Sequence, residues 1–235
     1  VHLKTHIDSF LLTMECQLKV QEEEQGLLYS VMYFPKAVQS IQHRRHHRIN
    51  IPIDQHLKGL EALGCKFELE GGYVHGSVDQ LVGADITLDV PTVTGTENIM
   101  MAAVLAEGVS IIRNAAAEPE IVDLARFLRS MGARIKGEGT ATLEIDGVPA
   151  LRPARQPYAI MGDRIEAGTY LLAGAITGGD VTTKGAPVGS MGAVFDKLKA
   201  AGCSVEIDGD AVRCSRSGPL NAVGISTQPH PRFPT

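Results

Sequence analysis

Two groups of charged residues lie close enough in the sequence to suggest acid–base chemistry. They are Glu118, Glu120 and Asp123 in one stretch, and Asp163, Arg164 and Glu166 in another. Neighbouring carboxylates can serve as general acid and general base. However, Arg113 and Arg126 lie near the first group, and the second group opens a predicted helix. We therefore expect ion pairs in the first group, and ion pairing with helix capping in the second.

The run QHRRHHR, which contains His43, His46 and His47, suggests a metal site or a phosphate-binding patch. A metal site needs further ligands at defined spacing, and the neighbouring sequence offers none. The four cysteines of the chain also lack a metal-ligand spacing, and their low density is typical of a protein in a reducing compartment. We expect a solvated basic run here, with no metal and no cofactor.

The composition indicates a globular protein. The chain has 235 residues, of which 44% are hydrophobic, and a net charge of −5. No apolar run approaches the roughly 20 residues that span a bilayer. The charge gives no electrostatic reason to expect a nucleic-acid partner. We expect a cytoplasmic protein without a membrane or nucleic-acid partner, whose oligomeric state the sequence does not specify.

The composition changes near residue 50. Residues 1–50 contain one glycine, Gly26, and carry a net charge of +1, whereas residues 51–235 contain 24 glycines and carry −6. The sequence also begins with Val and not with Met. We expect residues 1–50 to be a separate, disordered or artefactual segment, and residues 51–235 to be a folded part of a longer protein.

Three stretches of the second segment resemble one another. They are LEALGCKFELEGGYVHGS, LRSMGARIKGEGTATLEIDG and LKAAGCSVEIDGDAVRCS. Each reads as a helix end, a glycine and two short strands joined by a tight turn. The glycines are Gly64, Gly132 and Gly202, which lie 68 and 70 residues apart, and a second element with Gly108 and Gly179 recurs after 71 residues. The sequence therefore predicts a repeat of about 70 residues.

Each repeat reads as strand, helix, strand, helix, strand, strand, which predicts an α/β (α+β) fold of βαβαββ units. In one copy we expect strands at 85–90, 109–114, 133–138 and 140–146, and helices at 96–107 and 119–131. The next copy is expected at 158–214, with a helix at 167–177, and a further strand is expected at 223–227. The helices at 96–107 and 167–177 carry small residues on all faces, which predicts a core of helices with the sheets outside.

Five motifs resemble the enolpyruvyl transferases in wording, order and spacing. They are PIDQHLKGLEALG, TGTENIMMAAVLAEG, AEPEIVDLARFLRSMGA, DRIEAGTYLLAGAITGG and TQPHPRFPT. Together they cover most of residues 51–235. The resemblance implies one domain of the family's inside-out α/β barrel type, built from three units and incomplete at its N-terminus, with the second domain absent.

The motifs resemble the nucleotide-sugar branch of the family more than the shikimate branch. The resemblance implies phosphoenolpyruvate and UDP-N-acetylglucosamine as substrates. It also implies transfer of the enolpyruvyl group to the 3′-hydroxyl of the sugar, at the start of peptidoglycan synthesis. RNA 3′-terminal phosphate cyclases use a related unit, but the charge and the absence of a basic stripe weigh against RNA.

The family's catalytic loop does not match. Its pattern, Gly-x-Cys-x-x-Gly-x-Arg-Pro-x-Asp, precedes the first matching helix. Pro52 and Asp54 occupy the last positions, but the Cys position is His46 and the Arg position is Ile51. The resemblance therefore implies no catalytic residue at these positions, and we expect the chain to be inactive alone. The alternative is a non-catalytic nucleotide-sugar-binding or interaction protein on the same scaffold.

Two segments that contact the nucleotide sugar in the family are present. They are Pro52, Ile53, Asp54 and Gln55, and Thr92, Val93 and Thr94. Asp54 suits hydrogen bonds from uracil or ribose, and it equally suits an N-cap of the helix that ends near Gly64. The second segment is either a diphosphate site at a helix N-terminus or an ordinary strand-to-helix turn. Both interpretations stay open for each segment.

Overall fold

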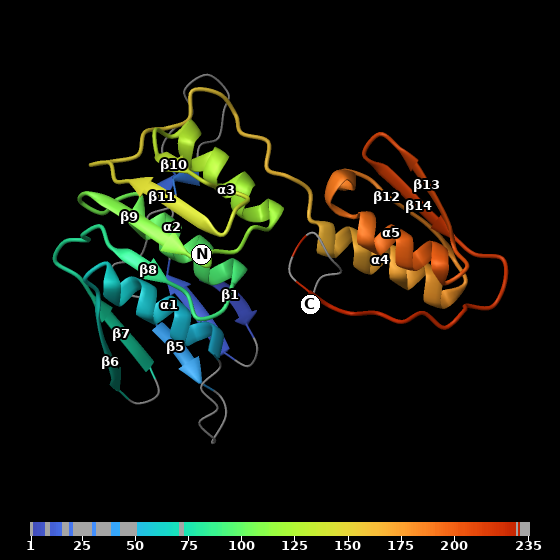
Figure 1. The fold of residues 1–235 in the computed structure, drawn as a ribbon, viewed down its shortest axis with the longest axis horizontal. Coiled ribbons are helices and arrows are strands. Elements are labelled where there is room, and N and C mark those ends of the chain that lie inside the picture. The colour runs from blue at the N-terminus through green and yellow to red at the C-terminus, as the bar shows by residue number, and fades with distance from the viewer. Residues whose placement is uncertain are drawn as a thin grey trace. The chain divides into compact units, whose positions relative to one another are not determined.

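The computed structural model describes residues 2–7, 10–15, 19–20, 30–31, 39–42, 51–70, 73–228 and 230 (Figure 1). Within the first 50 residues it has strands β1 (His2–Ile7), β2 (Phe10–Glu15), β3 (Lys19–Val20), β4 (Ser30–Val31) and β5 (Gln39–Gln42). The first, second and fifth strands form an antiparallel sheet, and β3 pairs with β4. The basic run with His46 lies outside the described residues.

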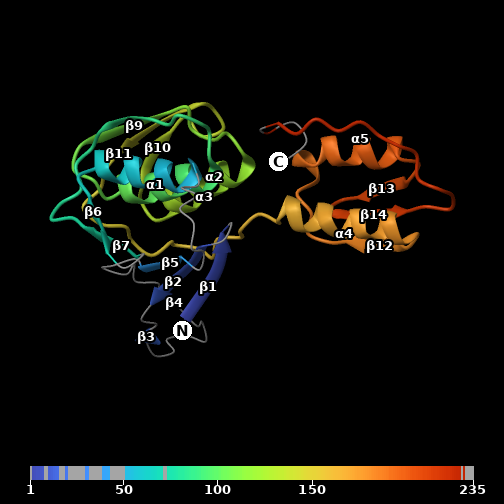
Figure 2. The same cartoon turned by 90° about the horizontal axis from the view of Figure 1, so that it is seen from below.

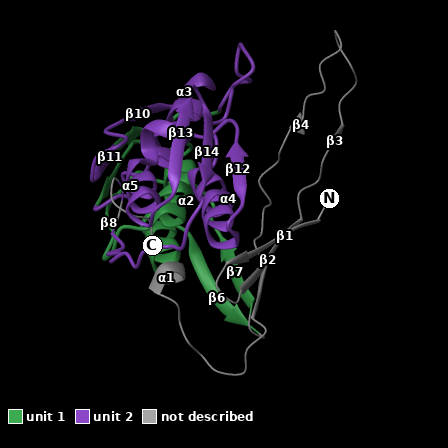
Figure 3. Ribbon diagram, turned by 90° about the vertical axis from the view of Figure 1, so that its right-hand side faces the viewer, with its two compact units in different colours: residues 1–113, 144–150 green, residues 114–143, 151–235 purple. Residues whose placement is uncertain are grey.

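The chain divides into two compact units, which Figure 3 colours separately. The first comprises residues 1–113 and 144–150, and the second comprises residues 114–143 and 151–235. Each unit is described by itself below.

After residue 50 the first unit continues with helix α1 (Ile51–Ala62) and a hairpin of β6 (Lys66–Glu70) and β7 (Tyr73–Ser77). The chain then forms β8 (Asp85–Thr87), α2 (Val93–Ala103) and β9 (Val109–Arg113), with β8 parallel to β9. The two helices lie side by side (Figures 1 and 2). Leu63, Ile99 and Met100 are fully buried, so these helices contribute to one core.

The second unit begins with α3 (Pro119–Ser130), β10 (Arg134–Lys136) and β11 (Thr142–Asp146). The last three residues of β11 are grouped with the first unit, and the strand order of its sheet is β10-β11-β9-β8. Helix α3 begins at Pro119, as predicted, because the fixed φ of proline suits the first helical turn.

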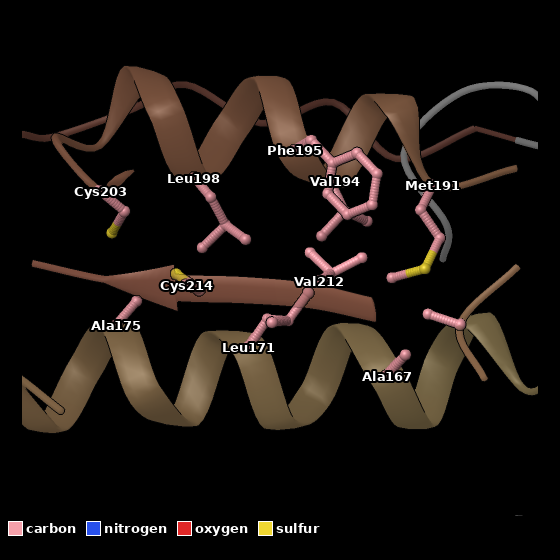
Figure 4. Close-up of a cluster of buried hydrophobic side chains, with 11 residues drawn as sticks. Ala167, Leu171, Ala175, Met191, Val194, Phe195, Leu198, Cys203, Val212 and Cys214 are labelled. Carbon is pink, nitrogen blue, oxygen red and sulfur yellow. The ribbon is translucent and has the colours of Figure 1, made fainter. Parts of the chain in front are cut away.

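The second unit ends with α4 (Arg164–Thr177), β12 (Asp180–Thr183), the short 3₁₀ helix η1 (Val188–Ser190), α5 (Gly192–Ala200), β13 (Ser204–Asp208) and β14 (Ala211–Ser215). The strands form an antiparallel sheet of order β12-β14-β13. Figure 4 shows Leu171 of α4 and Leu198 of α5 pointing toward β14, where Val212 is fully buried. Arg213 on the opposite face is exposed and forms ion pairs, so the helices cover one face of the sheet.

Three helices end in the same way. The residues Gly64, Gly132 and Gly202 follow α1, α3 and α5 with φ of +102°, +101° and +94°, as the sequence predicts. In each case the N–H after the glycine donates to a carbonyl of the last helical turn: Cys65 to Leu60, Ala133 to Leu128 and Cys203 to Leu198, each at 3.0 Å. The carbonyl before each glycine also accepts a distant N–H: Leu63 from Val82, Met131 from Arg152 and Ala201 from Asn221.

Several predicted boundaries are wrong. The helices expected from residues 96 and 167 begin at Val93 and Arg164, because Thr92 and Asp163 cap them earlier. The strand expected at 85–90 is limited to β8, and residues 221–226 form no strand. Helix α4 is followed by Gly178, which has a φ of +71°.

Two further predictions concern the whole chain. None of the described sheets closes into a barrel. No helix in the described ranges is both long enough and apolar enough to cross a membrane.

Candidate functional site

Asp54 lies inside the first turn of α1 and does not cap it. The helix already begins at Ile51, because Pro52 has the backbone angle that suits a first helical turn. This corrects the N-cap interpretation of Asp54. The residue is partly buried and lies in the first turn of the helix. It forms no hydrogen bond or ion pair within the described part of the chain, so it is available to a ligand.

The segment from Thr92 to Thr94 forms the N-terminus of α2. Thr92 is the N-cap, with φ −134° and ψ 126°, and its Oγ1 accepts a hydrogen bond from the N–H of Gly95 at 3.3 Å. Val93 and Thr94 are the first two helical residues. Backbone N–H groups and hydroxyls at such a terminus can bind an anion.

Gln55 joins α1 to the segment that precedes α2. Its Nε2 donates to Oδ2 of Asp89 at 2.8 Å, and its Oε1 accepts from the backbone N–H of Asp89 at 2.8 Å. Lys58 donates to the same carboxylate oxygen at 2.8 Å. Lys58 and Gln55 hold the pKa of the Asp89 carboxyl below its usual value. Asp89 in turn raises the pKa of Lys58.

His56 joins α1 to α2 directly, and the sequence analysis did not select it. Its Nδ1 lies 2.7 Å from Nδ2 of Asn98, and its Nε2 lies 3.3 Å from Oγ1 of Thr94. Since the Asn98 amide donates to Nδ1, the ring is neutral and carries its proton on Nε2. Burial lowers the pKa of His56, which also favours the neutral ring. Its position next to Asp54 and Gln55 is the only sequence signal for this role.

The first predicted segment is thus tied to the second at two places: Gln55 bonds to Asp89, which lies just before the second segment, and His56 bonds to Thr94 within it. Pro52 and Ile53 lie in the first turn of α1, and their side chains are outside the described part of the structure. His46, which stands at the family's cysteine position, also lies outside the described residues. The described residues contain no group of three His, Cys, Asp or Glu side chains suited to a metal ion.

The carboxylate cluster of the second unit is structural, but its partners differ from those expected. Glu120 pairs with Arg164 at 2.8 Å, and Asp123 accepts the hydroxyl hydrogen of Tyr158 at 2.9 Å. Arg113, which was expected to join this cluster, instead pairs with Asp85 at 2.9 Å. These partners come from distant parts of the chain, so sequence proximity could not identify them.

Asp163 caps α4, as the sequence predicts. Its Oδ1 accepts from the N–H groups of Ile165 at 2.7 Å and Glu166 at 3.0 Å. The next residue, Arg164, has only 10% of its side chain exposed and extends to α3 through its pair with Glu120. This group therefore fixes the start of α4 against α3.

Comparisons with known proteins give the chain a family. The sequence model of the protein family described as EPSP synthase (3-phosphoshikimate 1-carboxyvinyltransferase) matches residues 40–235. UDP-N-acetylglucosamine 1-carboxyvinyltransferase from Myxococcus xanthus is 52% identical over 184 residues, which cover 78% of this chain and 43% of the relative. The protein of the same name from Desulfatibacillum aliphaticivorans is 52% identical over 184 residues, which cover 78% of this chain and 44% of that one. The chain therefore spans less than half the length of these relatives.

A solved structure is similar in fold. The crystal structure of the enolpyruvyl transferase NikO from Streptomyces tendae superimposes with a TM-score of 0.61 at 21% identity, over 72% of this chain and 43% of that chain. The likeness extends the sequence match to the arrangement of helices and strands. The chain belongs to the EPSP synthase (3-phosphoshikimate 1-carboxyvinyltransferase) family, whose members are enolpyruvyl transferases.

Proposed function

We propose that this chain provides part of the nucleotide-sugar site of an enzyme that transfers the enolpyruvyl group of phosphoenolpyruvate to the 3′-hydroxyl of UDP-N-acetylglucosamine. The names of the relatives at 52% identity support this choice of substrates over shikimate 3-phosphate. Two observations carry the proposal. His56 of α1 bonds to Thr94 of α2, and the neighbouring Gln55 bonds to Asp89 in the segment that precedes α2.

In this site the N-terminus of α2 and the Asp54 carboxylate would bind different parts of the nucleotide sugar. The α2 N-terminus, with Thr92 and Thr94, offers N–H and hydroxyl donors suited to a diphosphate. Asp54 offers a carboxylate suited to the N–H of uracil or the hydroxyls of ribose. His56, neutral and bonded to Thr94, keeps that hydroxyl oriented.

The transfer itself needs more than this site. The 3′-oxygen of the sugar adds to the enol carbon of phosphoenolpyruvate while the methylene carbon takes a proton from an acid and a base takes the hydroxyl proton. Loss of phosphate and of a proton from the newly formed methyl group then restores the double bond. By the resemblance, the acid and one phosphate-binding arginine belong at His46 and Ile51. We therefore propose that the 235-residue polypeptide binds the sugar nucleotide without transferring the enolpyruvyl group.

The proposed architecture is that of three related units within one domain, residues 51–235. The identical hydrogen bonds around Gly64, Gly132 and Gly202 support it. So do the strand orders, because β10-β11-β9 in one sheet corresponds to β13-β14-β12 in the other. The cytoplasmic location that we propose is supported by the free thiols of Cys65, Cys203 and Cys214.

An inside-out arrangement, with helices at the centre, is supported by the surface of α4. Ile165, Leu172 and Ile176 are exposed on one side of the helix, away from the buried Leu171. A second apolar face is expected on a helix that packs against other helices as well as against its own sheet.

Calorimetric titration of the 235-residue chain with UDP-N-acetylglucosamine tests the binding proposal. We expect saturable heat with this ligand and with UDP, and none with shikimate 3-phosphate. The variant Asp54→Asn should bind more weakly, whereas the exposed control Asp79→Asn should bind like the wild type. Absence of heat at millimolar ligand would contradict the proposal.

A phosphate-release assay with both substrates tests the proposed lack of transfer. We expect release at the background rate, because the family's acid and arginine have no counterparts at His46 and Ile51. Release above background that scales with protein concentration would overturn this part of the proposal. Binding without release is also the outcome that the alternative function, a non-catalytic nucleotide-sugar-binding protein, requires.

A further inference from the structure

Gln55 is committed to the protein and not to a ligand. The residue is only 2% exposed, and both polar atoms of its side chain already have a partner in Asp89. The pairing is two-point: a carboxylate accepts from the amide nitrogen while a backbone N–H donates to the amide oxygen. Both bonds are 2.8 Å long, so the side chain is fixed in orientation as well as position. We call this pair the Gln55–Asp89 latch.

The latch joins the two segments of the proposed site at a useful point. On α1, Gln55 lies between Asp54, which is available to a ligand, and His56, which bonds to Thr94. On the other side, Asp89 immediately precedes the short stretch that leads to the N-cap Thr92. The latch therefore restrains both the start of α1 and the approach to α2.

We propose that Gln55 is a positioning residue: the Gln55–Asp89 latch holds the N-terminus of α2 against the first turn of α1 in the arrangement that binds a nucleotide sugar. The inference rests on the proposed function. Without the latch, the α2 donors and the Asp54 carboxylate have to be brought together by the ligand, and part of the binding energy is spent on that ordering. The latch thus sets affinity although it does not contact the ligand.

The chain contains a matched control for this chemistry. Gln80 donates its Nε2 to Glu107 at 2.6 Å, so it forms the same kind of amide–carboxylate bond in the same unit. This pair is exposed and shares no hydrogen bond with Asp54, Thr92 or Thr94. A Gln→Glu change therefore places two carboxylates together at either site, but only one of the sites adjoins the proposed ligand.

The test is a double-mutant cycle read as the Kd for UDP-N-acetylglucosamine, by calorimetry at a temperature where circular dichroism reports every variant folded. Gln55→Glu opposes two carboxylates and should raise the Kd about tenfold or more. Gln55→Glu with Asp89→Asn restores both hydrogen bonds, because the asparagine amide now donates to the glutamate, and should return the Kd to within about threefold of wild type. Asp89→Asn alone completes the cycle, and Gln80→Glu should leave the Kd unchanged.

The outcomes separate this inference from the proposed function. If the wild type binds and the double variant remains as weak as Gln55→Glu, Gln55 acts by direct contact and the inference is overturned. Equal binding by Gln55→Glu and wild type overturns it as well. If the wild type itself gives no saturable heat, the proposed function fails and this inference fails with it.

Discussion

His56 illustrates how one side chain can be tuned by its neighbours without a charged partner. The amide of Asn98 donates to Nδ1, and Nε2 faces the hydroxyl of Thr94, so a proton added to Nδ1 would oppose the Asn98 donor. Burial acts in the same direction and lowers the pKa of His56. The neutral ring is therefore part of the folded structure between α1 and α2.

The lowered pKa of His56 makes stability depend on pH. Below its ordinary value of 6.5, the unfolded chain binds the proton more readily than the folded chain. The contribution of His56 is therefore complete above that pH and is lost as the pH falls through the folded pKa. We expect urea titrations at about pH 7.5 and about pH 5.5 to show a smaller difference in unfolding free energy for His56→Gln than for the wild type. Equal differences in the two proteins would contradict the assignment of a neutral ring.

At the scale of elements, glycine sets how closely α1 approaches α2. A Cβ on Gly59 would lie 2.2 Å from Cδ1 and 2.5 Å from Cγ1 of Ile99, which is fully buried. At this close approach, His56 of α1 reaches Thr94 and Asn98 of α2. Helix ends such as Gly64 were predictable, because a left-handed glycine is a local property of the chain.

Other features of these elements depend on distant or competing partners and could not be predicted. The start of α2 was misplaced because Thr92, Thr94 and Thr96 are all capable caps, and the sequence alone does not choose among them. Strand β8 is shorter than the apolar pattern suggests, since a strand lasts only where its neighbour pairs with it. The bond from Gln55 to Asp89 links residues 34 positions apart, so no local pattern marks it.

Gly59→Ala tests the close approach of the helices. We expect it to lower the unfolding free energy by about 1–3 kcal/mol, because the fully buried Ile99 side chain would have to shift to make room. Gly192→Ala is the control, since a Cβ at that helical position meets no atom within 4 Å. It should leave the unfolding free energy unchanged or raise it by about 0.5 kcal/mol. Chemical denaturation measures the unfolding free energy of both variants. Equal values would argue against the close contact of Gly59 with Ile99.

At the scale of the molecule, helix α4 carries an exposed apolar face that its own unit does not cover. Ile176 is 69% exposed on a helix whose opposite face is anchored by Leu171. The proposed central position of the helices accounts for it, because a central helix is covered on more than one side.

A polar substitution on this face measures whether it is covered in solution. If helices meet at the centre, Ile176→Lys should lower the unfolding free energy by about 1–3 kcal/mol, because it places a charge against apolar neighbours. Ile160 is 76% exposed in the connection before α4, and Ile160→Lys should change the unfolding free energy by less than about 0.5 kcal/mol. Thermal or urea unfolding of the two variants would show equal stability if the face of α4 stays open.

The hydrogen bonds from Val82 to Leu63, from Arg152 to Met131 and from Asn221 to Ala201 close three loops of similar length. In each loop a backbone hydrogen bond joins the residue before the loop to the residue after it, and the loop contains two paired strands. The same closing hydrogen bond in three loops supports the proposal that these segments are copies of one repeat. If gene duplication produced the three segments, their sequences have since diverged while this hydrogen bond was kept.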